Sequence, residues 1–170
     1  MDLKKIIRDI PDFPKEGIVF KDITTLLKDA DAFKETIDQL VDRYKDYDFN
    51  YIAGIEARGF IFAAPLALAM GKGLIPIRKV GKLPGETITA SYDLEYGSNA
   101  VEMHKDALKK GDKVLLVDDL LATGGTVAAA VDLIEELGAK VFSIAFLLEL
   151  EFLNGREKLQ GKEVFSLLKE

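Results

Sequence analysis

The sequence of 170 residues contains no cysteine and only one histidine, His104. The absence of cysteine excludes disulfide bonds, zinc sites built from thiolates and a cysteine nucleophile. The sequence also has neither a Gly-x-Ser-x-Gly nor a His-Glu-x-x-His pattern, so a serine hydrolase or a zinc enzyme has little support. We interpret His104 as a surface or structural residue.

Long apolar runs are also missing. No segment approaches the roughly 18 apolar residues that cross a bilayer, and the first residues lack the apolar core of a secretory signal. We therefore expect a cytoplasmic protein without a membrane partner. The formal net charge is −6, which repels nucleic acid. The basic residues that do cluster lie at 78–82, a pattern that indicates a small anionic ligand.

Hydrophobic residues make up 48% of the sequence and charged residues 31%, as in ordinary globular proteins. A chain of this length buries one substantial core and is too short to predict two. We expect a single domain over residues 1–170, with no repeat, linker or low-complexity segment.

The most informative stretch runs from Val114 to Thr126. Its four leading apolar residues predict a buried parallel strand over 114–117. Asp118 and Asp119 follow directly, at the end of the strand where α/β sheets place their binding sites. A loop over 120–126 and an apolar helix over 127–137 come next.

That loop contains two adjacent glycines and two threonines. Small residues let backbone N–H groups approach an anion, and the following helix N-terminus adds partial positive charge. The lysine of the ATP-binding P-loop is missing after the last glycine. A phosphate with sugar hydroxyls beside it, such as ribose 5-phosphate, fits the loop and the acidic pair. Two acids before a Gly-Gly turn can also merely cap a helix, and receiver domains also place carboxylates at a strand end.

The remaining elements are predicted from hydrophobic periodicity. Leu3, Ile6, Ile7 and Ile10 have helical spacing and predict a short helix that Pro11 ends. Residues 12–22 read as extended chain, which either packs Phe13 and Phe20 into the core or offers backbone groups to a planar base. We further expect a helix over 31–44 and another over 60–70, strands over 51–55, 74–77, 100–103 and 141–148, a mobile loop over 80–90, and an edge strand near 164–168.

The thirteen residues from Val114 to Thr126 resemble the phosphoribosyl-pyrophosphate-binding signature of the type I phosphoribosyltransferases. The resemblance, which is to the members that use adenine, runs nearly end to end through residues 12–14, 17–23, 57–60, 78–79, 81–85, 91–97 and 155–159. It implies a three-layer α/β fold with a mostly parallel sheet flanked by helices. It also implies a small N-terminal hood within residues 1–25, a flexible catalytic lid over 80–97, and a non-proline cis peptide near Glu56–Ala57.

The activity that the resemblance implies is purine salvage, in which adenine and 5-phosphoribosyl 1-pyrophosphate give AMP and pyrophosphate. It implies Mg²⁺ held mainly by the substrate, with no protein metal ligands, and a homodimer. Two alternatives stay open: a phosphoribosyltransferase for another base, and a non-catalytic regulator that binds phosphoribosyl pyrophosphate.

Site residues follow from the same resemblance. Periodicity does not rank Glu95 against Glu102, and the resemblance selects Glu95. The catalytic residues are Glu95, Arg58 and Lys82. The ribose 5-phosphate ligands are Asp118, Asp119, Ala122, Thr123, Gly124, Gly125 and Thr126. The pyrophosphate ligands are Arg58, Arg78, Lys79 and Lys82, and the adenine contacts are Val19, Phe20, Lys21 and Leu120.

The base preference has a physical reading. Adenine presents an N6 donor beside an N1 acceptor, so a carbonyl of Val19 and an N–H of Lys21 accept adenine. A 6-oxopurine presents the reverse pattern and leaves these buried groups unpaired. Lys21 stands where the family commonly has arginine, which is tolerated if only the backbone reads the base.

Overall fold

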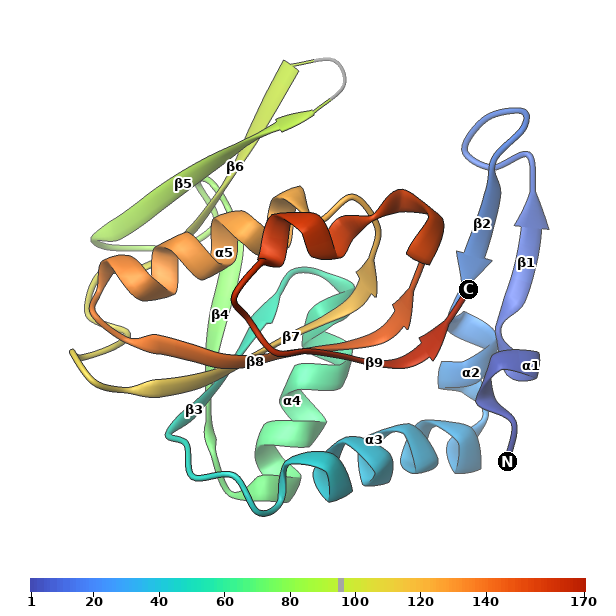
Figure 1. The fold of residues 1–170 in the computed structure, drawn as a ribbon, viewed down its shortest axis with the longest axis horizontal. Helices are drawn as coiled ribbons and strands as arrows, with labels where there is room; N and C mark the ends of the chain where they lie inside the picture. The colour runs from blue at the N-terminus through green and yellow to red at the C-terminus, as the bar shows by residue number, and fades with distance from the viewer. Residues whose placement is uncertain (95–96) are drawn as a thin grey trace.

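A mixed β-sheet runs through the centre of the computed structural model, which describes residues 1–94 and 97–170 (Figure 1). Within those residues the strand order is β5-β6-β4-β3-β7-β8-β9. The neighbouring pairs β3–β4, β3–β7, β7–β8 and β8–β9 are parallel, whereas β6 is antiparallel to β4 and β5 antiparallel to β6. The strands are β3 (Tyr51–Ile55), β4 (Gly73–Lys79), β5 (Thr87–Leu94), β6 (Gly97–His104), β7 (Lys113–Leu121), β8 (Lys140–Glu149) and β9 (Val164–Lys169).

Helices cover both faces of this sheet and complete three layers (Figure 1). One face carries α5 (Gly125–Glu136), and the other carries α3 (Ala30–Tyr44) and α4 (Arg58–Met70), with α2 (Thr24–Lys28) beside α3. The run 114–117 shows why four apolar residues stand together. Val114 and Leu116 pack in the core under α5, whereas Leu115 and Val117 pack in the core with α3 and α4. The predicted fold class is confirmed.

The N-terminal hood is built around a separate two-stranded sheet. It consists of α1 (Leu3–Ile6), β1 (Arg8–Pro11) and β2 (Val19–Asp22), with the two strands antiparallel. The helix predicted from Leu3 to Ile10 is wrong beyond Ile6, because Ile7 turns to extended backbone and Ile10 pairs with Phe20. So short a helix is marginal in water, and pairing with β2 satisfies the backbone of this segment instead.

Among the other boundaries that differ from the sequence prediction, two have a clear cause in strand pairing. β7 continues through Asp118 and Asp119 to Leu121, because the long neighbour β8 keeps pairing with it as far as Glu149. The loop predicted over 80–90 ends earlier, because β5 begins at Thr87 and pairs with β6 along its length. The predicted edge strand is β9, and the Glu56–Ala57 peptide is cis, as the resemblance implied.

Short 3₁₀ helices, η1 (Glu151–Leu153) and η2 (Gly155–Leu159), connect β8 to β9. In Figure 1 they lie between the start of α5 and the hood. No helix in the described part of the chain has the length and hydropathy to cross a membrane.

Candidate active site

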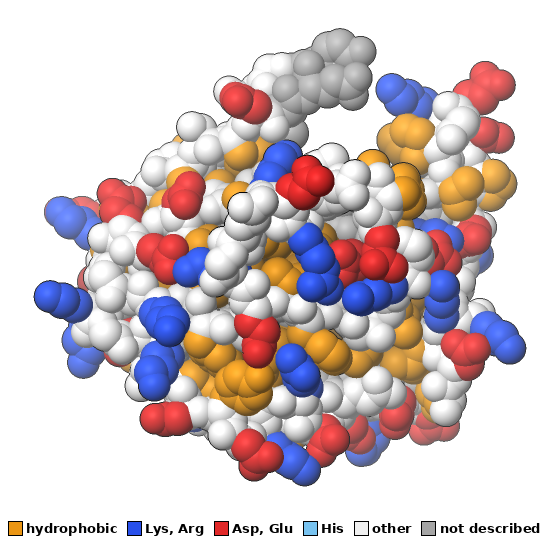
Figure 2. Space-filling model, viewed as in Figure 1, with side chains coloured by type: hydrophobic (Ala, Val, Ile, Leu, Met, Phe, Trp, Pro, Cys, Tyr) orange, Lys and Arg blue, Asp and Glu red, His pale blue; other side chains and the backbone are white. Residues whose placement is uncertain are grey.

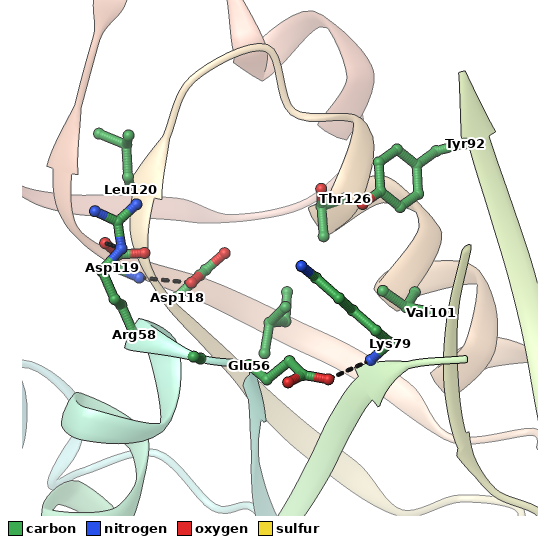
Figure 3. Close-up of a pocket in the computed structure, with 11 residues that line it drawn as sticks. Glu56, Arg58, Lys79, Tyr92, Val101, Asp118, Asp119, Leu120 and Thr126 are labelled. Carbon is green, nitrogen blue, oxygen red and sulfur yellow. Dashed lines mark hydrogen bonds and ion pairs between the residues drawn. The ribbon is translucent and has the colours of Figure 1, made fainter. Parts of the chain in front are cut away.

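A cavity of about 290 Å³ opens at the carboxyl ends of β3, β4 and β7 (Figure 3). Figure 3 shows Lys79 and Asp118 pointing into it from opposite sides, with Thr126 and Tyr92 on the far wall. The lining residues are Ile55, Glu56, Ala57, Arg58, Lys79, Tyr92, Val101, Asp118, Asp119, Leu120 and Thr126. The cavity therefore lies where the sequence placed the site, at the end of the strand that carries the acidic pair.

The acidic pair is held tightly. Asp118 Oδ1 accepts the backbone N–H of Asp119 at 2.8 Å, and Asp119 Oδ2 lies 3.0 Å from Arg58 Nε. Burial, together with the negative charge of Asp119, raises the pKa of Asp118 well above its usual range. A ligand that offers hydroxyl groups or a cation to this pair stabilises its ionised form.

The first turn of α4 approaches this pair closely at Gly59. A Cβ on Gly59 would lie 2.8 Å from Asp118 Oδ1 and 3.2 Å from the carbonyl oxygen of Val117. Only glycine lets the helix begin this close to β7. This approach places Arg58 within reach of Asp119.

Next to the acidic pair, the β7–α5 loop surrounds a smaller hollow of about 90 Å³. Its walls are Asp118, Leu120, Ala122, Thr123, Gly124, Gly125, Thr126 and Val127. α5 begins here without a side-chain cap, after Gly124 at φ +88°. The N–H groups of its first turn are therefore open to an anion, and Thr123 and Thr126 add hydroxyl donors.

This loop is supported from outside by η2. A Cβ on Gly124 would lie 2.6 Å from the carbonyl oxygen of Gly155, and a Cβ on Gly155 would lie 2.4 Å from the carbonyl oxygen of Ala122. Arg156 then pins η2, because its Nε and Nη2 each donate to the carboxylate of Glu149 at 2.8 Å. The shape of the β7–α5 loop over residues 122–126, called the anion loop below, thus depends on Gly124, Gly155 and the buried carboxylate of Glu149.

The predicted pyrophosphate ligands are only partly brought together. Arg58 and Lys79 line the main cavity. Arg78 lies beside Lys79 on β4, but its Nη2 contacts Glu56 Oε2 at 3.4 Å and it does not line the cavity. Lys82 is exposed in the loop over 80–86. Glu95 lies outside the described residues.

The hood contacts one of the cavity-lining residues, Arg58, through the Phe20 ring. The guanidinium carbon of Arg58 lies 5.5 Å from the centre of the Phe20 ring, and Phe13 packs edge-to-face on Phe20 at 5.1 Å. Leu120 lines the same cavity as Arg58. Arg58 thus contacts Phe20 of the hood and lines the cavity together with Leu120.

The backbone of β2 has an open edge. The carbonyl of Ile18 accepts the N–H of Phe13 at 3.1 Å, so Ile18 turns its backbone toward β1. Backbone groups alternate in an antiparallel pair, and those of Val19 and Lys21 therefore turn away from β1. Their side chains line a separate cavity of about 640 Å³ between the hairpin formed by β1 and β2, called the hairpin below, and η1. Figure 2 shows the hollow beside this hairpin.

Sequence reasoning missed the role of Glu102. This carboxylate is 4% exposed and accepts the backbone N–H groups of Gly81 at 3.1 Å and Leu83 at 3.3 Å, and the hydroxyl of Thr87 at 3.1 Å. The sequence signal for this role was an acidic residue between two apolar residues of a strand, Val101 and Met103, that follows a glycine-containing loop. His104 bonds the carbonyl of Pro84 at 2.9 Å, consistent with a structural residue. Glu56 and Tyr92 were not predicted as site residues either.

These features define a class. A parallel strand that ends in two carboxylates, an uncapped helix N-terminus behind a glycine loop, and cations across one cavity are the arrangement that suits a phosphorylated sugar.

Comparison with known proteins specifies the family. Residues 21–167 match the family described as "Phosphoribosyl transferase domain". An adenine phosphoribosyltransferase of Halothermothrix orenii is 64% identical over 170 residues and covers 100% of both chains. The crystal structure of adenine phosphoribosyltransferase from Thermoanaerobacter pseudethanolicus has a TM-score of 0.96 and 54% identity, covering 99% of this chain and 98% of its own.

The enzyme from Saccharomyces cerevisiae, solved in complex with adenine and an imino-altritol bisphosphate, has a TM-score of 0.92 and 43% identity, covering 98% of this chain and 96% of its own. The chain belongs to the phosphoribosyltransferase family, in the branch of the adenine phosphoribosyltransferases. The family resemblance read from Val114–Thr126 is thereby confirmed.

Proposed function

We propose that the protein transfers the phosphoribosyl group of 5-phosphoribosyl 1-pyrophosphate to adenine, giving AMP and pyrophosphate. The observation that carries this proposal is a single cavity that joins the acidic pair to Arg58, Lys79 and Thr126, with the open first turn of α5 beside it. The relatives, at up to 64% identity over the full chain, support the same reaction.

In this reaction a ring nitrogen of adenine forms a bond to the anomeric carbon while the bond from that carbon to pyrophosphate breaks. The leaving group takes the electron pair, so positive charge develops on the ribose. Asp118 and Asp119 bind the ribose hydroxyls and place negative charge beside that cation. The loop from Ala122 to Thr126 holds the 5′-phosphate. The proton lost from the adenine nitrogen passes to Glu95.

The departing pyrophosphate needs positive charge and exclusion of water. Arg58 and Lys79 already lie in the cavity, and we assign Arg78 and Lys82 to the same anion. Lys82 is carried by the exposed loop over 80–86, which leads into the hairpin of β5 and β6. Closure of this segment over the sheet edge would bring its charge to the leaving group and suppress hydrolysis.

Adenine binds between Phe20 and Leu120, in the space that the Arg58 side chain borders. The open edge of β2 then reads its 6-amino group with the carbonyl of Val19 and its N1 with the N–H of Lys21. Only backbone groups take part, so lysine in place of arginine at position 21 leaves the reading of the base intact.

The cofactor in this proposal is Mg²⁺. No group of three or more metal-ligating side chains occurs in the described part of the chain, but the two carboxylates Asp118 and Asp119 face the cavity. Two carboxylates fit an ion whose other ligands are substrate oxygens and water. When bound, Mg²⁺ supplies charge neutralisation on the pyrophosphate. We place the reaction in the cytoplasm, where a multiply charged sugar phosphate is retained.

We also propose a homodimer formed through α4. After Arg58 this helix has no charged residue, yet Leu68 is 85% exposed and Ala64 and Ala69 are exposed beside it. A helix that is apolar on all sides is normally covered. A second copy of the chain is the occupant that the resemblance implies.

Leu68→Glu should therefore convert a dimer into a monomer, because it puts a charge into the apolar contact. Light scattering after size exclusion measures the mass. Glu136→Lys, at an exposed position of α5 on the opposite face of the sheet, is the matched control and should leave the dimer unchanged. A wild-type chain that runs as a monomer at micromolar concentration would contradict the assignment.

The test of the reaction is a panel of bases. Phosphoribosyl pyrophosphate and Mg²⁺ are supplied with adenine, hypoxanthine, guanine, xanthine, uracil or orotate in separate assays. We expect AMP from adenine, with other bases slower by about 1000-fold or more, because their donors and acceptors leave buried backbone groups unpaired. Turnover of another base would make the protein a phosphoribosyltransferase for that base. Tight binding of phosphoribosyl pyrophosphate without any turnover would make it a regulator.

A further inference from the structure

We propose that Glu170 is a positioning residue for the base, because its side chain ties Lys21 of the hood to the end of the central sheet. The inference rests on the proposed function, in which the backbone of Lys21 reads adenine. It concerns a residue that does not line the cavity over the acidic pair.

Glu170 is fixed to the main domain by its own backbone. Its N–H donates to the carbonyl of Glu149 at 2.9 Å, and its carbonyl accepts the N–H of Glu151 at 2.8 Å. Glu149 is itself 3% exposed and held by Arg156 and Ser166. Glu170 therefore continues the edge strand β9 at a well-anchored position.

From this position the carboxylate of Glu170 reaches the hood. It forms an ion pair with Lys21 Nζ, which also lies 2.6 Å from Asp9 Oδ1 on the paired strand β1. The Lys21 side chain is only 14% exposed, so water weakens this pair less than an ordinary surface pair. One ammonium group thus joins both strands of the hairpin to the sheet.

Few other charges restrain the hairpin. Within the described part of the chain, the pair Arg8–Asp22 joins the two hairpin strands only to each other, and Lys4 in α1 reaches Glu170 at 3.9 Å. Figure 1 shows the end of β9 meeting the lower part of β2, while the hairpin rises away from the domain. Arg58 of α4 also contacts the hairpin, with its guanidinium carbon 5.5 Å from the centre of the Phe20 ring. Loss of the Glu170 ion pair would weaken the attachment at the base of the hairpin and let it tilt.

Such a tilt acts mainly on the base. The N–H of Lys21 and the carbonyl of Val19 would move relative to Leu120, whereas the anion loop and the acidic pair belong to the sheet and stay in place. Misplacement of recognition groups by about 1 Å is enough to weaken binding strongly. The signature of this role is a selective loss of affinity for adenine.

The experiment compares wild type, Glu170→Gln and Glu170→Lys, with Asp38→Asn as the matched control. Asp38 forms an exposed pair with Lys34 on α3, away from the hood. We expect Glu170→Lys to raise the KM for adenine by about tenfold and Glu170→Gln by less, because the second only removes the charge that the first reverses. The KM for phosphoribosyl pyrophosphate, kcat and the melting temperature should stay near the wild-type values.

Two results would overturn the inference. One is an unchanged KM for adenine in both Glu170 variants. The other is an equal rise of both KM values together with a lower melting temperature, which indicates a purely structural role. If wild type does not convert adenine at all, the proposed function fails; if it does and the Glu170 variants match it, only the positioning role fails.

Discussion

Asparagine in place of Asp119 is expected to lower kcat by about 100-fold or more while the fold stays intact. The carboxylate is 6% exposed and contacts Arg58 Nε at 3.0 Å. The amide keeps the shape of the side chain but removes the negative charge beside the ribose cation. The charge therefore disappears where the transition state needs it most.

AMP formation at saturating substrate measures this effect, and thermal unfolding monitors the fold. Asp132→Asn is the matched control, because Asp132 is an exposed acid on α5. It should retain wild-type turnover. A near-normal kcat for Asp119→Asn would remove Asp119 from the site.

The second large effect is expected at Gly155, outside the signature sequence. A Cβ there would lie 2.4 Å from the carbonyl oxygen of Ala122 and 2.8 Å from the Leu121 side chain. The Ala122 oxygen is backbone, so the anion loop must shift. We expect Gly155→Ala to cost about 1–3 kcal/mol of stability and to raise the KM for phosphoribosyl pyrophosphate by about tenfold or more.

Gly125→Ala is the comparison for stability. A Cβ on Gly125 meets the Tyr92 ring at an ordinary 3.5 Å, although Gly125 is the first residue of α5 and lines the anion hollow. Its melting temperature should stay close to that of wild type, whereas that of Gly155→Ala should fall. Equal melting temperatures for the two variants would show that the close approach at Gly155 is relieved without cost.

The position of the site at the carboxyl ends of the strands could be predicted from the sequence, because both of its signals are local. Four apolar residues require two covered faces, and the acids that follow them mark the strand end. The hood was harder. Ile10 has helical spacing from Leu3, but its conformation is decided by pairing with Phe20, a contact that crosses a turn. Hydrophobic periodicity over a few residues carries no information about such a strand partner.

The cation cluster shows a second limit. Arg78 and Lys79 are neighbours in the sequence and were assigned to one anion, yet consecutive residues of a strand face opposite sides. Lys79 faces the cavity and Arg78 contacts Glu56. The support that Gly155 gives to the loop was also out of reach, because it depends on spacing between segments that lie about thirty residues apart in the printed sequence.

The hydrogen bonds at Glu102 tie the segment after β4 to strand β6. Gly81, Leu83 and Thr87 all donate to this one carboxylate on β6, and His104 on the same strand bonds Pro84. The loop over 80–86 and the strand β6 are therefore joined as one body. Because β6 also pairs with β4 through Arg78–Glu102 and Lys79–Val101, this body is anchored to the central sheet, and a movement of Lys82 toward the cavity would bend the paired strands rather than refold a slack loop.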